Sequence, residues 1–349
     1  MRIALVAHTF LPHIGGLEIY TYRLARDLKN KGEDVCVLTT NWGIDQKEQF
    51  SFPVYYFRAW PVILRNPFSF ALLFHLFKNQ YDILHLQSIW FWPSVYAALF
   101  KKKAKIVTTV HGVYPEKANL ITRIGLVCFK PLAHFILSRS DKVIVLSGRE
   151  KEKLVKIFKI SPKKIEIIPP GIEVEKPSLK IQDKLRKKYK LLAKKVILFT
   201  GRILPEKNPQ LLIKALPKIK EEIKNIKIVF VGPVEKGFRE KLLELAGENS
   251  QDIIFAGPFH PIKEATTLAN LYALSDVFVA LGEWEGVPLR ILEARAYGLP
   301  IAEGILNPEK LAQKISEILI SKKRPQYFRN LKSHFWPNVL DKIYRVYKV

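Results

Sequence analysis

The pattern that most constrains the fold is an alternation of short apolar strands and amphipathic helices, which starts at the first residues. Arg2 to His8 is typical of a buried strand. A loop with Pro12, Gly15 and Gly16 follows, and apolar residues at helical spacing then lead to a strand over residues 34–40. This order predicts an α/β fold with a parallel sheet wound on both faces. Further strands are expected at residues 54–57, 83–86, 105–110, 142–146 and 165–168.

The alternation stops at Pro169-Pro170-Gly171, a rigid turn typical of a domain boundary, and restarts at Val196. Because a single core usually stops growing at about 250–300 residues, a chain of 349 residues has room for two such domains. In the second part, strands are expected at residues 196–200, 227–231 and 253–256, and helices at residues 209–219, 238–246, 308–320 and 336–347.

Polar side chains follow several strands of the predicted first sheet. In doubly wound sheets ligands bind beyond the carboxyl ends of the strands, so these side chains are candidates for a site. Gln87, His111 and Ser147 come directly after three of the strands. For His111, a structural role and a functional role remain equally open at this point.

Two loops precede helices and fit anionic groups. Gly15 and Gly16 let the backbone approach a ligand at a helix N-terminus, although a plain tight turn explains a glycine pair equally well. The corresponding loop of the second part carries Arg202 and Lys207. A guanidinium that bridges two oxygens, beside an ammonium point charge, suits a diphosphate.

The stretch over residues 282–300 combines a loop and a helix. Pro288 suits the first turn of a helix, and Gly298 suits a left-handed cap at its end. Glu285 then lies in the loop before the helix, and Glu293 lies more than one turn inside it. Loop amides and the helix dipole favour a phosphate, whereas a carboxylate favours paired sugar hydroxyls. The alternative is an amphipathic helix with solvated glutamates.

The chain is strongly basic, with 57 Lys and Arg against 32 Asp and Glu, a formal charge of +25. Such a charge favours an anionic partner: a membrane surface, a nucleic acid or a phosphorylated ligand. Between Glu48 and Glu116 the only acidic residue is Asp82, and large aromatic residues are interleaved with lysines and arginines. They predict a surface that rests on anionic lipid headgroups; the alternative is that they form the core. These aromatic residues are Trp60, Phe68, Phe70, Phe74, Phe77, Trp90, Phe91, Trp92 and Tyr96.

Other features narrow the class of protein. The two cysteines, Cys36 and Cys128, indicate neither a disulfide framework nor a zinc site, and the sequence contains no metal-binding motif. No nucleic-acid-binding module is recognisable, so nucleic acid is not an expected partner. The N-terminus does not resemble a secretory signal, and the longest nearly apolar stretches, 68–77 and 89–100, are shorter than the ~20 residues that span a bilayer. A cytoplasmic protein is expected.

Together these residues resemble family 4 of the retaining glycosyltransferases, over nearly the whole chain. The family has the GT-B fold: two facing Rossmann-like domains, a deep cleft between them and a C-terminal helix that crosses back to the first domain. The resemblance therefore implies an acceptor-binding domain over residues 1–172, joined by a last helix at about 335–349, and a nucleotide-sugar-binding domain over residues 173–334. It rests on Pro12 with Gly15-Gly16, Asp82-Ile-Leu-His85, Thr109-Val-His111-Gly112, Asp141-Lys-Val-Ile-Val-Leu-Ser147, Ile168-Pro-Pro-Gly171-Ile-Glu173, Gly201-Arg202 with Lys207, and the spacing of Glu285 and Glu293.

The resemblance also assigns roles. Arg202 and Lys207 would hold the donor diphosphate, and Glu293 would bind the ribose hydroxyls. Gly15 and Gly16 would bring the first loop close to the diphosphate or the acceptor. Two residues are implied at the reacting centre: Glu285 at the donor sugar and His111 at the sugar or its phosphate. The backbone that would hold the donor sugar beside Glu285 is that of Gly286, Val287, Pro288 and Leu289.

The implied reaction moves a hexose from a nucleoside diphosphate sugar, with UDP-sugars and GDP-mannose as candidates, to a lipid-linked or other glycan acceptor. The anomeric configuration is retained, and neither a cofactor nor a metal is required. Because the departing phosphate accepts the acceptor's proton, Glu285 is a positioning group and not a nucleophile. The protein would work in the cytoplasm, in peripheral contact with the inner face of the cell membrane. The base, the sugar, the acceptor and the oligomeric state stay open.

Three departures from the family pattern stand out. Gln87 replaces a frequent second histidine, and Ala280-Leu281-Gly282 replaces a Pro-Ser pair. After Ile301-Ala302, a strand and a glycine-rich segment that the family normally carries do not follow, and whether the short joint over residues 301–304 is a true deletion or an omitted loop stays open. The alternative hypothesis is therefore a weakened or silent protein that keeps the GT-B fold and the nucleotide-sugar site.

Overall fold

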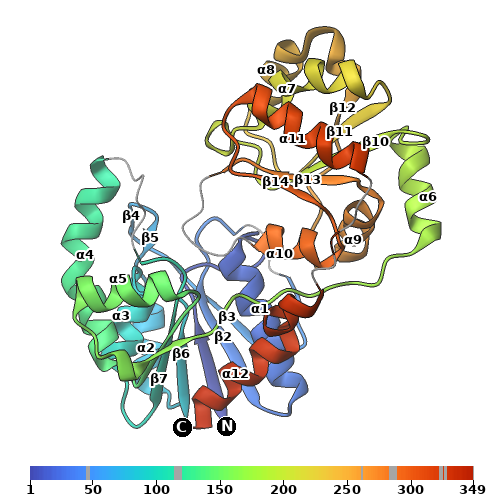
Figure 1. Ribbon diagram of the computed structural model, residues 1–349. Helices are drawn as coiled ribbons and strands as arrows, with labels where there is room; N and C mark the ends of the chain where they lie inside the picture. The colour runs from blue at the N-terminus through green and yellow to red at the C-terminus, as the bar shows by residue number, and fades with distance from the viewer. Residues whose placement is uncertain are drawn as a thin grey trace. The chain divides into compact units, whose positions relative to one another are not determined.

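The chain divides into two compact units, each built on its own sheet (Figure 1). The first unit comprises Met1–Gly171 and Trp336–Val349, and the second comprises Ile172–Phe335. These divisions lie beside the boundaries expected at residues 172 and about 335. The computed structural model describes residues 1–44, 48–113, 120–260, 262–282, 289–321, 325 and 328–348.

The sheet of the first unit has seven parallel strands in the order β3-β2-β1-β6-β7-β8-β9. Strands β1, β2 and β3 follow one another towards one edge of the sheet, and β6 to β9 follow one another towards the other edge. The topological switch point therefore lies between β1 and β6. Its strands are β1 (Arg2–Val6), β2 (Asp34–Thr40), β3 (Val54–Phe57), β6 (Ile83–Leu86), β7 (Lys105–Val110), β8 (Lys142–Val145) and β9 (Ile165–Ile167). A separate antiparallel hairpin joins β4 (Val62–Ile63) to β5 (Asn66–Pro67).

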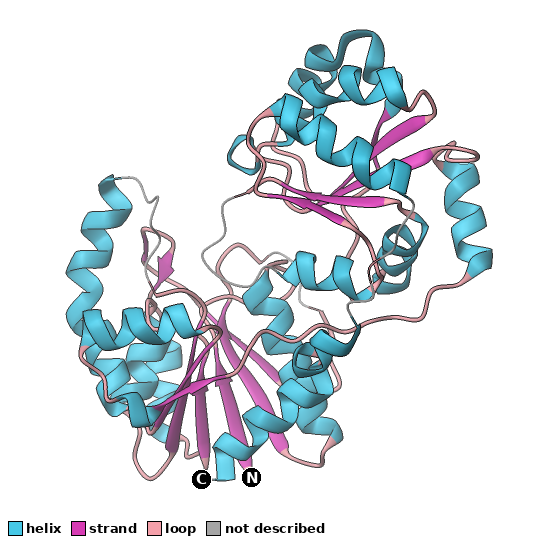
Figure 2. Ribbon diagram, viewed as in Figure 1, coloured by secondary structure: helices cyan, strands magenta, loops and turns pink. Residues whose placement is uncertain are grey.

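Helices cover both faces of this sheet (Figure 2). One face packs against α2 (Phe70–Lys78), α3 (Trp92–Leu99), α4 (Leu120–Arg139) and α5 (Gly148–Phe158), whose buried side chains share one core with Leu84 and Leu86 of β6. His85 lies between these two leucines and points to the opposite face, because side chains alternate along a strand. There it meets Tyr347 of α12 (Trp336–Lys348). The first helix, α1 (Gly16–Asn30), contacts β2, and a short 3₁₀ turn, η1, spans Pro162–Lys164.

Helix α12 is anchored in the first unit at both ends. Trp336 is 2% exposed, and its indole nitrogen donates a hydrogen bond of 2.6 Å to Asp27. The ring lies on Gly171, where a β-carbon would come within 2.5 Å of it, so only glycine fits beneath the indole. At the other end, the Tyr347 hydroxyl is 2.6 Å from Nδ1 of His85. The last helix therefore completes the unit that the N-terminus begins.

The second unit has five parallel strands in the order β12-β11-β10-β13-β14, with the switch point between β10 and β13. Its strands are β10 (Lys195–Thr200), β11 (Ile226–Val231), β12 (Ile253–Phe255), β13 (Val277–Ala280) and β14 (Ile301–Glu303). Its helices are α6 (Leu179–Lys188), α7 (Pro209–Glu222), α8 (Phe238–Ala246), α9 (Ala265–Leu274), α10 (Leu289–Ala296) and α11 (Pro308–Ser321), with 3₁₀ turns η2 (Pro205–Lys207), η3 (Gly247–Asp252) and η4 (Phe328–His334).

Each face of this second sheet carries one hydrophobic core. One packs α7, α8 and α11 against it, and the other packs α6, α9 and α10. Both sheets are parallel and covered on both faces, which confirms the predicted α/β class. The expected strands and helices lie within a few residues of their predicted bounds, and β2, β3, β6 and β7 match them.

The short joint after Ala302 is a regular connection. Strand β14 pairs with β13, and Gly304 then turns with a φ of +70°, its N–H donating to Ala280 at 3.0 Å. Asn307 accepts a hydrogen bond of 2.8 Å from the backbone of Lys310 and so caps the start of α11. The chain thus passes directly from an edge strand through a left-handed turn into a capped helix.

Helix α4 corrects one expectation. Residues 121–139 form a helix of sufficient length and apolarity to cross a membrane, with a mean hydropathy of 1.3, and 17% of it is buried. The expectation that all apolar stretches are too short was wrong, because Arg123, Lys130 and Pro131 divide this one into short runs. Helix α4 resembles a membrane span in length and composition only. Its residues Ala133, Ile136 and Leu137 are fully buried in the core of the first unit.

Replacement of Trp336 by Ala should lower the free energy of unfolding by about 3–5 kcal/mol, because a large buried side chain and its bond to Asp27 are lost. Trp60→Ala is the matched control, since Trp60 is 68% exposed and its loss should change stability little. Urea denaturation of the full chain, followed by circular dichroism, measures both. Equal stability of the two variants would contradict the anchoring of α12.

Candidate active site

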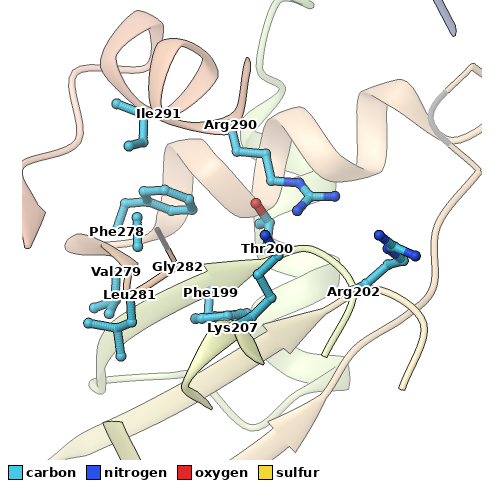
Figure 3. A pocket seen from close by; sticks show the side chains of 11 residues that line it. Phe199, Thr200, Arg202, Lys207, Phe278, Val279, Leu281, Gly282, Arg290 and Ile291 are labelled. Carbon is cyan, nitrogen blue, oxygen red and sulfur yellow. The ribbon is translucent and has the colours of Figure 1, made fainter. Parts of the chain in front are cut away.

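A pocket lies at the switch point of the second sheet, where β10 and β13 separate. Their register ends at Leu198 with Phe278, before either strand ends, and the residues beyond this pair line the pocket. The pocket contains about 300 Å³ of empty space, part of it open solvent. Figure 3 shows apolar side chains on one side of this view and three cationic side chains on the other. The lining consists of Phe199, Thr200, Arg202, Lys207, Phe278, Val279, Ala280, Leu281, Gly282, Arg290 and Ile291.

Arg202 and Lys207, both predicted from the sequence, line this same pocket. Gly201 makes the turn out of β10 with a φ of +139°, a backbone conformation that residues other than glycine rarely adopt. Arg202 follows it directly. Lys207 ends the 3₁₀ turn η2. Burial lowers the pKa of Lys207, and the guanidinium groups of Arg290 and Arg202 lower it further. The pocket is therefore a region of concentrated positive charge.

Arg290 is a third cation of the pocket, to which the sequence analysis gave no role. Its side chain is half-buried, and its guanidinium lies directly over Gly201, where a β-carbon would come within 2.1 Å of Nη1. Within the part of the chain that the structure describes, neither Arg290 nor Arg202 has an acidic partner or a hydrogen-bond acceptor. One signal was available in the sequence: Arg290 precedes Glu293 by three residues, so both lie on one side of a helix.

Glu293 is held by a buried tyrosine. The Tyr272 hydroxyl donates a hydrogen bond of 3.1 Å to Oε2 of Glu293 and lies 3.0 Å from the hydroxyl of Thr200, which lines the pocket. Burial, and then the Glu293 carboxylate, raise the pKa of Tyr272 well above its ordinary value, so the hydroxyl keeps its proton. Tyr272 lies inside an apolar helical run and was not a candidate from the sequence.

Helix α10, which carries Arg290 and Glu293, ends as predicted. Gly298 has a φ of +68°, and Leu299 donates a hydrogen bond of 3.0 Å to the carbonyl of Ala294. Leu289 is the first residue of the helix and is half-buried. The predicted loop residues Glu285, Gly286, Val287 and Pro288 lie outside the described residues, so their roles stay predictions.

In the first unit, polar side chains collect at the carboxyl ends of β1, β6 and β7. Nε2 of His111 is 3.3 Å from Oε1 of Gln87, and the His111 ring packs edge-on against Tyr20 at 4.9 Å. His8 stacks on Phe91 at 3.4 Å. Burial lowers the pKa of His111 to about 4 and that of His8 to about 3, so both rings are neutral at pH 7. His111 is thus a hydrogen-bonding group and not a charge.

Buried polar atoms in this cluster are left without partners. Among the described residues, Nε2 of Gln87 and Nδ1 of His8 are buried and form no hydrogen bond. Buried donors and acceptors in proteins are usually paired, so such atoms are candidates to meet a ligand or a water. In the sequence, Gln87 was a candidate because it directly follows a strand, and it also departs from the family pattern.

The predicted glycines lie at the start of α1. Gly15 is its N-cap in an extended conformation, and a β-carbon there would come within 2.4 Å of the Glu18 carboxylate. A β-carbon on Gly16 would meet nothing within 4 Å, so this turn borders open space. Tyr20, one turn further along α1, contacts His111. The first unit therefore brings the predicted glycines and the predicted histidine to one end of its sheet.

The motif from Asp82 to His85 has a structural role in this chain. Asp82 accepts a hydrogen bond of 2.7 Å from the backbone of Arg2, which fixes β6 beside β1. His85 is fully buried between Tyr347 and Thr109, and burial lowers its pKa to about 3. Over the residues that the structure describes, no group of three or more histidine, cysteine, aspartate or glutamate side chains is arranged to hold a metal ion.

Comparison with known proteins identifies the family. Residues 14–176 match the profile described as Glycosyltransferase Family 4, and residues 181–303 match the profile described as Glycosyl transferases group 1. The chain belongs to glycosyltransferase family 4. The second profile ends at Glu303, where β14 ends and the short joint begins.

Individual relatives align with most or all of the chain. Spore coat protein SA of Bacillus subtilis is 25% identical over 392 aligned residues, which cover 100% of this chain and 99% of the relative. An Escherichia coli enzyme named UDP-Gal:alpha-D-GlcNAc-diphosphoundecaprenol alpha-1,3-galactosyltransferase is 30% identical over 257 residues, 70% of this chain and 63% of the enzyme. Anabaena HepE, solved with UDP and glucose, superposes with a TM-score of 0.75 at 17% identity, covering 99% of each chain. The glycosyltransferase thus has the GT-B fold.

Tyr272→Phe should lower the free energy of unfolding by about 1–2 kcal/mol, because Thr200 and Glu293 each lose a buried hydrogen-bond partner. Tyr55→Phe is the control, since Tyr55 is 46% exposed and the change should be nearly neutral. Urea unfolding of both variants measures the difference. A Tyr272→Phe protein as stable as the control would show that the hydroxyl does not hold Glu293.

Proposed function

We propose that this glycosyltransferase moves a hexose from a nucleoside diphosphate sugar to a lipid-linked or other glycan acceptor, with retention of the anomeric configuration. The observation that carries the proposal is the pocket at the end of β10, where Arg202, Lys207 and Arg290 concentrate positive charge. HepE, which binds UDP and glucose, and the E. coli galactosyltransferase, whose name gives a UDP-sugar donor and a diphosphoundecaprenol-linked acceptor, support it.

The chemistry follows from where charge develops. As the bond between C1 of the sugar and the diphosphate oxygen breaks, negative charge grows on the leaving diphosphate, and nearby cations stabilise it. On the same face, the acceptor hydroxyl forms the new bond to C1 and gives its proton to a leaving phosphate oxygen. We propose that the side-chain cations supply this neutralisation without a dedicated metal or cofactor.

The remaining predicted residues take positioning roles in this proposal. Glu293 accepts hydrogen bonds from the ribose hydroxyls, and Tyr272 holds its carboxylate in place from behind. His111, neutral at pH 7, exchanges a hydrogen bond with the sugar or its phosphate. Glu285 and the backbone of residues 286–289 hold the donor sugar. The alternative of a silent binding protein is not favoured, because the aligned relatives include a named galactosyltransferase and a solved complex with UDP and glucose.

We further propose that the first unit rests on the inner face of the cell membrane, through a membrane-facing surface formed by α4 and the β4–β5 hairpin. Ile121, Ile124 and Val127 of α4 are 55–63% exposed, and Ile63 of the hairpin is 62% exposed. The two elements lie side by side (Figure 1), with Leu64 against Gly125. Such large exposed apolar patches usually mark an interaction site.

The positive charge of α4 favours an anionic membrane as the partner of this surface. Helix α4 contains Arg123, Lys130 and Arg139 and no acidic residue. Apolar side chains between cations suit an interface with anionic lipid, each cation adding about 1 kcal/mol near such a surface. Since Ala133, Ile136 and Leu137 on one face of the second half of α4 pack in the core of the first unit, the helix would lie on the membrane and not cross it.

Nucleoside diphosphate binding should weaken about ten- to hundredfold in Arg202→Ala and in Lys207→Ala, because each change removes a charge-assisted contact to the diphosphate. A thermal-shift panel of UDP-, GDP- and ADP-sugars identifies the donor, and turnover is then followed with membranes present, with and without EDTA. Lys214→Ala, an exposed lysine of α7, is the control. Undiminished binding in both pocket variants would contradict the proposal, and loss of turnover in EDTA would contradict its metal-free form.

Vesicles of phosphatidylglycerol should bind the full chain more tightly than vesicles of phosphatidylcholine, and the double variant Ile124→Asp/Val127→Asp should weaken that binding at least tenfold. Leu179→Asp is the matched control, because Leu179 is 79% exposed and lies on α6 of the second unit. Vesicle co-flotation measures all three proteins. Equal binding of the double variant and the control would exclude this surface.

A further inference from the structure

The proposed donor site contains one cation more than the pair that the sequence predicts. Arg290 is the second residue of α10, and its guanidinium occupies the space in front of Gly201. A β-carbon at Gly201 would come within 2.1 Å of Nη1 and 2.9 Å of Cζ, so the absence of a side chain there is what admits the guanidinium. The place of Arg290 is thus built into the end of β10.

The surroundings of Arg290 differ from those of the other arginine on the same helix. Arg295 forms an ion pair of 3.1 Å with Glu303. Arg290 is half-buried, yet within the described ranges of the chain no carboxylate or carbonyl accepts any of its five N–H groups. A half-buried guanidinium to which the described residues offer no acceptor is suited to bind an anionic ligand, which would accept its hydrogen bonds.

The number of cations also fits the ligand. A nucleoside diphosphate carries about three negative charges near neutral pH, whereas a monophosphate carries about two. Arg202, Lys207 and Arg290 together offer three positive charges around one pocket. Arg290 and Arg202 both repel the charged form of Lys207 and so lower its pKa, in addition to the larger effect of burial. A bound anion would reduce this repulsion.

We propose that Arg290 is a third ligand of the donor diphosphate and makes the site select nucleoside diphosphates over monophosphates. This inference rests on the proposed function and names a specificity-determining residue for it. A planar guanidinium donates two parallel hydrogen bonds to phosphate oxygens, a geometry that lysine cannot reproduce.

Calorimetric titration of the full chain with UDP, UMP and uridine tests the proposal, with GDP, GMP and guanosine in parallel. Arg290→Gln should weaken diphosphate binding about ten- to hundredfold, monophosphate binding less, and nucleoside binding not at all. Arg290→Lys should recover part of the loss. Arg295→Gln, which removes a charge from the same helix, should leave all three affinities unchanged.

The outcomes separate the inference from the function on which it rests. An unchanged ratio of diphosphate to monophosphate affinity in Arg290→Gln would overturn the role of Arg290, and so would an equal loss for all three ligands, which is the mark of a structural role. Failure of the unmodified chain to bind any of these nucleotides would contradict the proposed function itself, and the inference with it.

Discussion

The gathering of three cations at the end of one strand is the constraint on which the candidate site depends. The turn at Gly201 brings Arg202 out of β10, and η2 returns Lys207 to the same place. Arg290 enters from α10 over Gly201. Among the described residues neither Arg202 nor Arg290 has an acidic partner, so an anionic ligand would find unpaired positive charge in this pocket.

Parallel topology explains why these residues meet. Strands β10 and β13 are neighbours at the switch point, and their pairing stops before either strand ends. Residues from three separate segments of the sequence therefore line one pocket. In the first unit, polar side chains likewise gather at the switch point between β1 and β6, but these groups are neutral. His8 and His111 are uncharged at pH 7, and Gln87 is an amide. One sheet thus presents charge, and the other presents hydrogen-bonding groups.

Much of this fold is readable from the sequence because its strands are short, mostly apolar and separated by regular helices. The rule that polar residues follow strands located His111, and the change of pattern at Val196 located Arg202. Arg290 and Tyr272 could not be assigned, because helical spacing does not show which strand a side chain will meet. Helix α4 was overlooked because two cations and a proline interrupt an apolar run whose mean hydropathy, 1.3, is still high enough for a membrane span by composition. The expected roles of Glu285 and Gly286 remain predictions.

The central claim is that a donor diphosphate binds among Arg202, Lys207 and Arg290, with the ribose on Glu293. A crystal structure of the chain with a bound nucleoside diphosphate, UDP or GDP as the binding panel directs, tests it most directly. The account predicts phosphate oxygens within hydrogen-bond distance of all three cations and ribose hydroxyls on the Glu293 carboxylate. A diphosphate bound elsewhere, or one from which Arg290 points away, would contradict it.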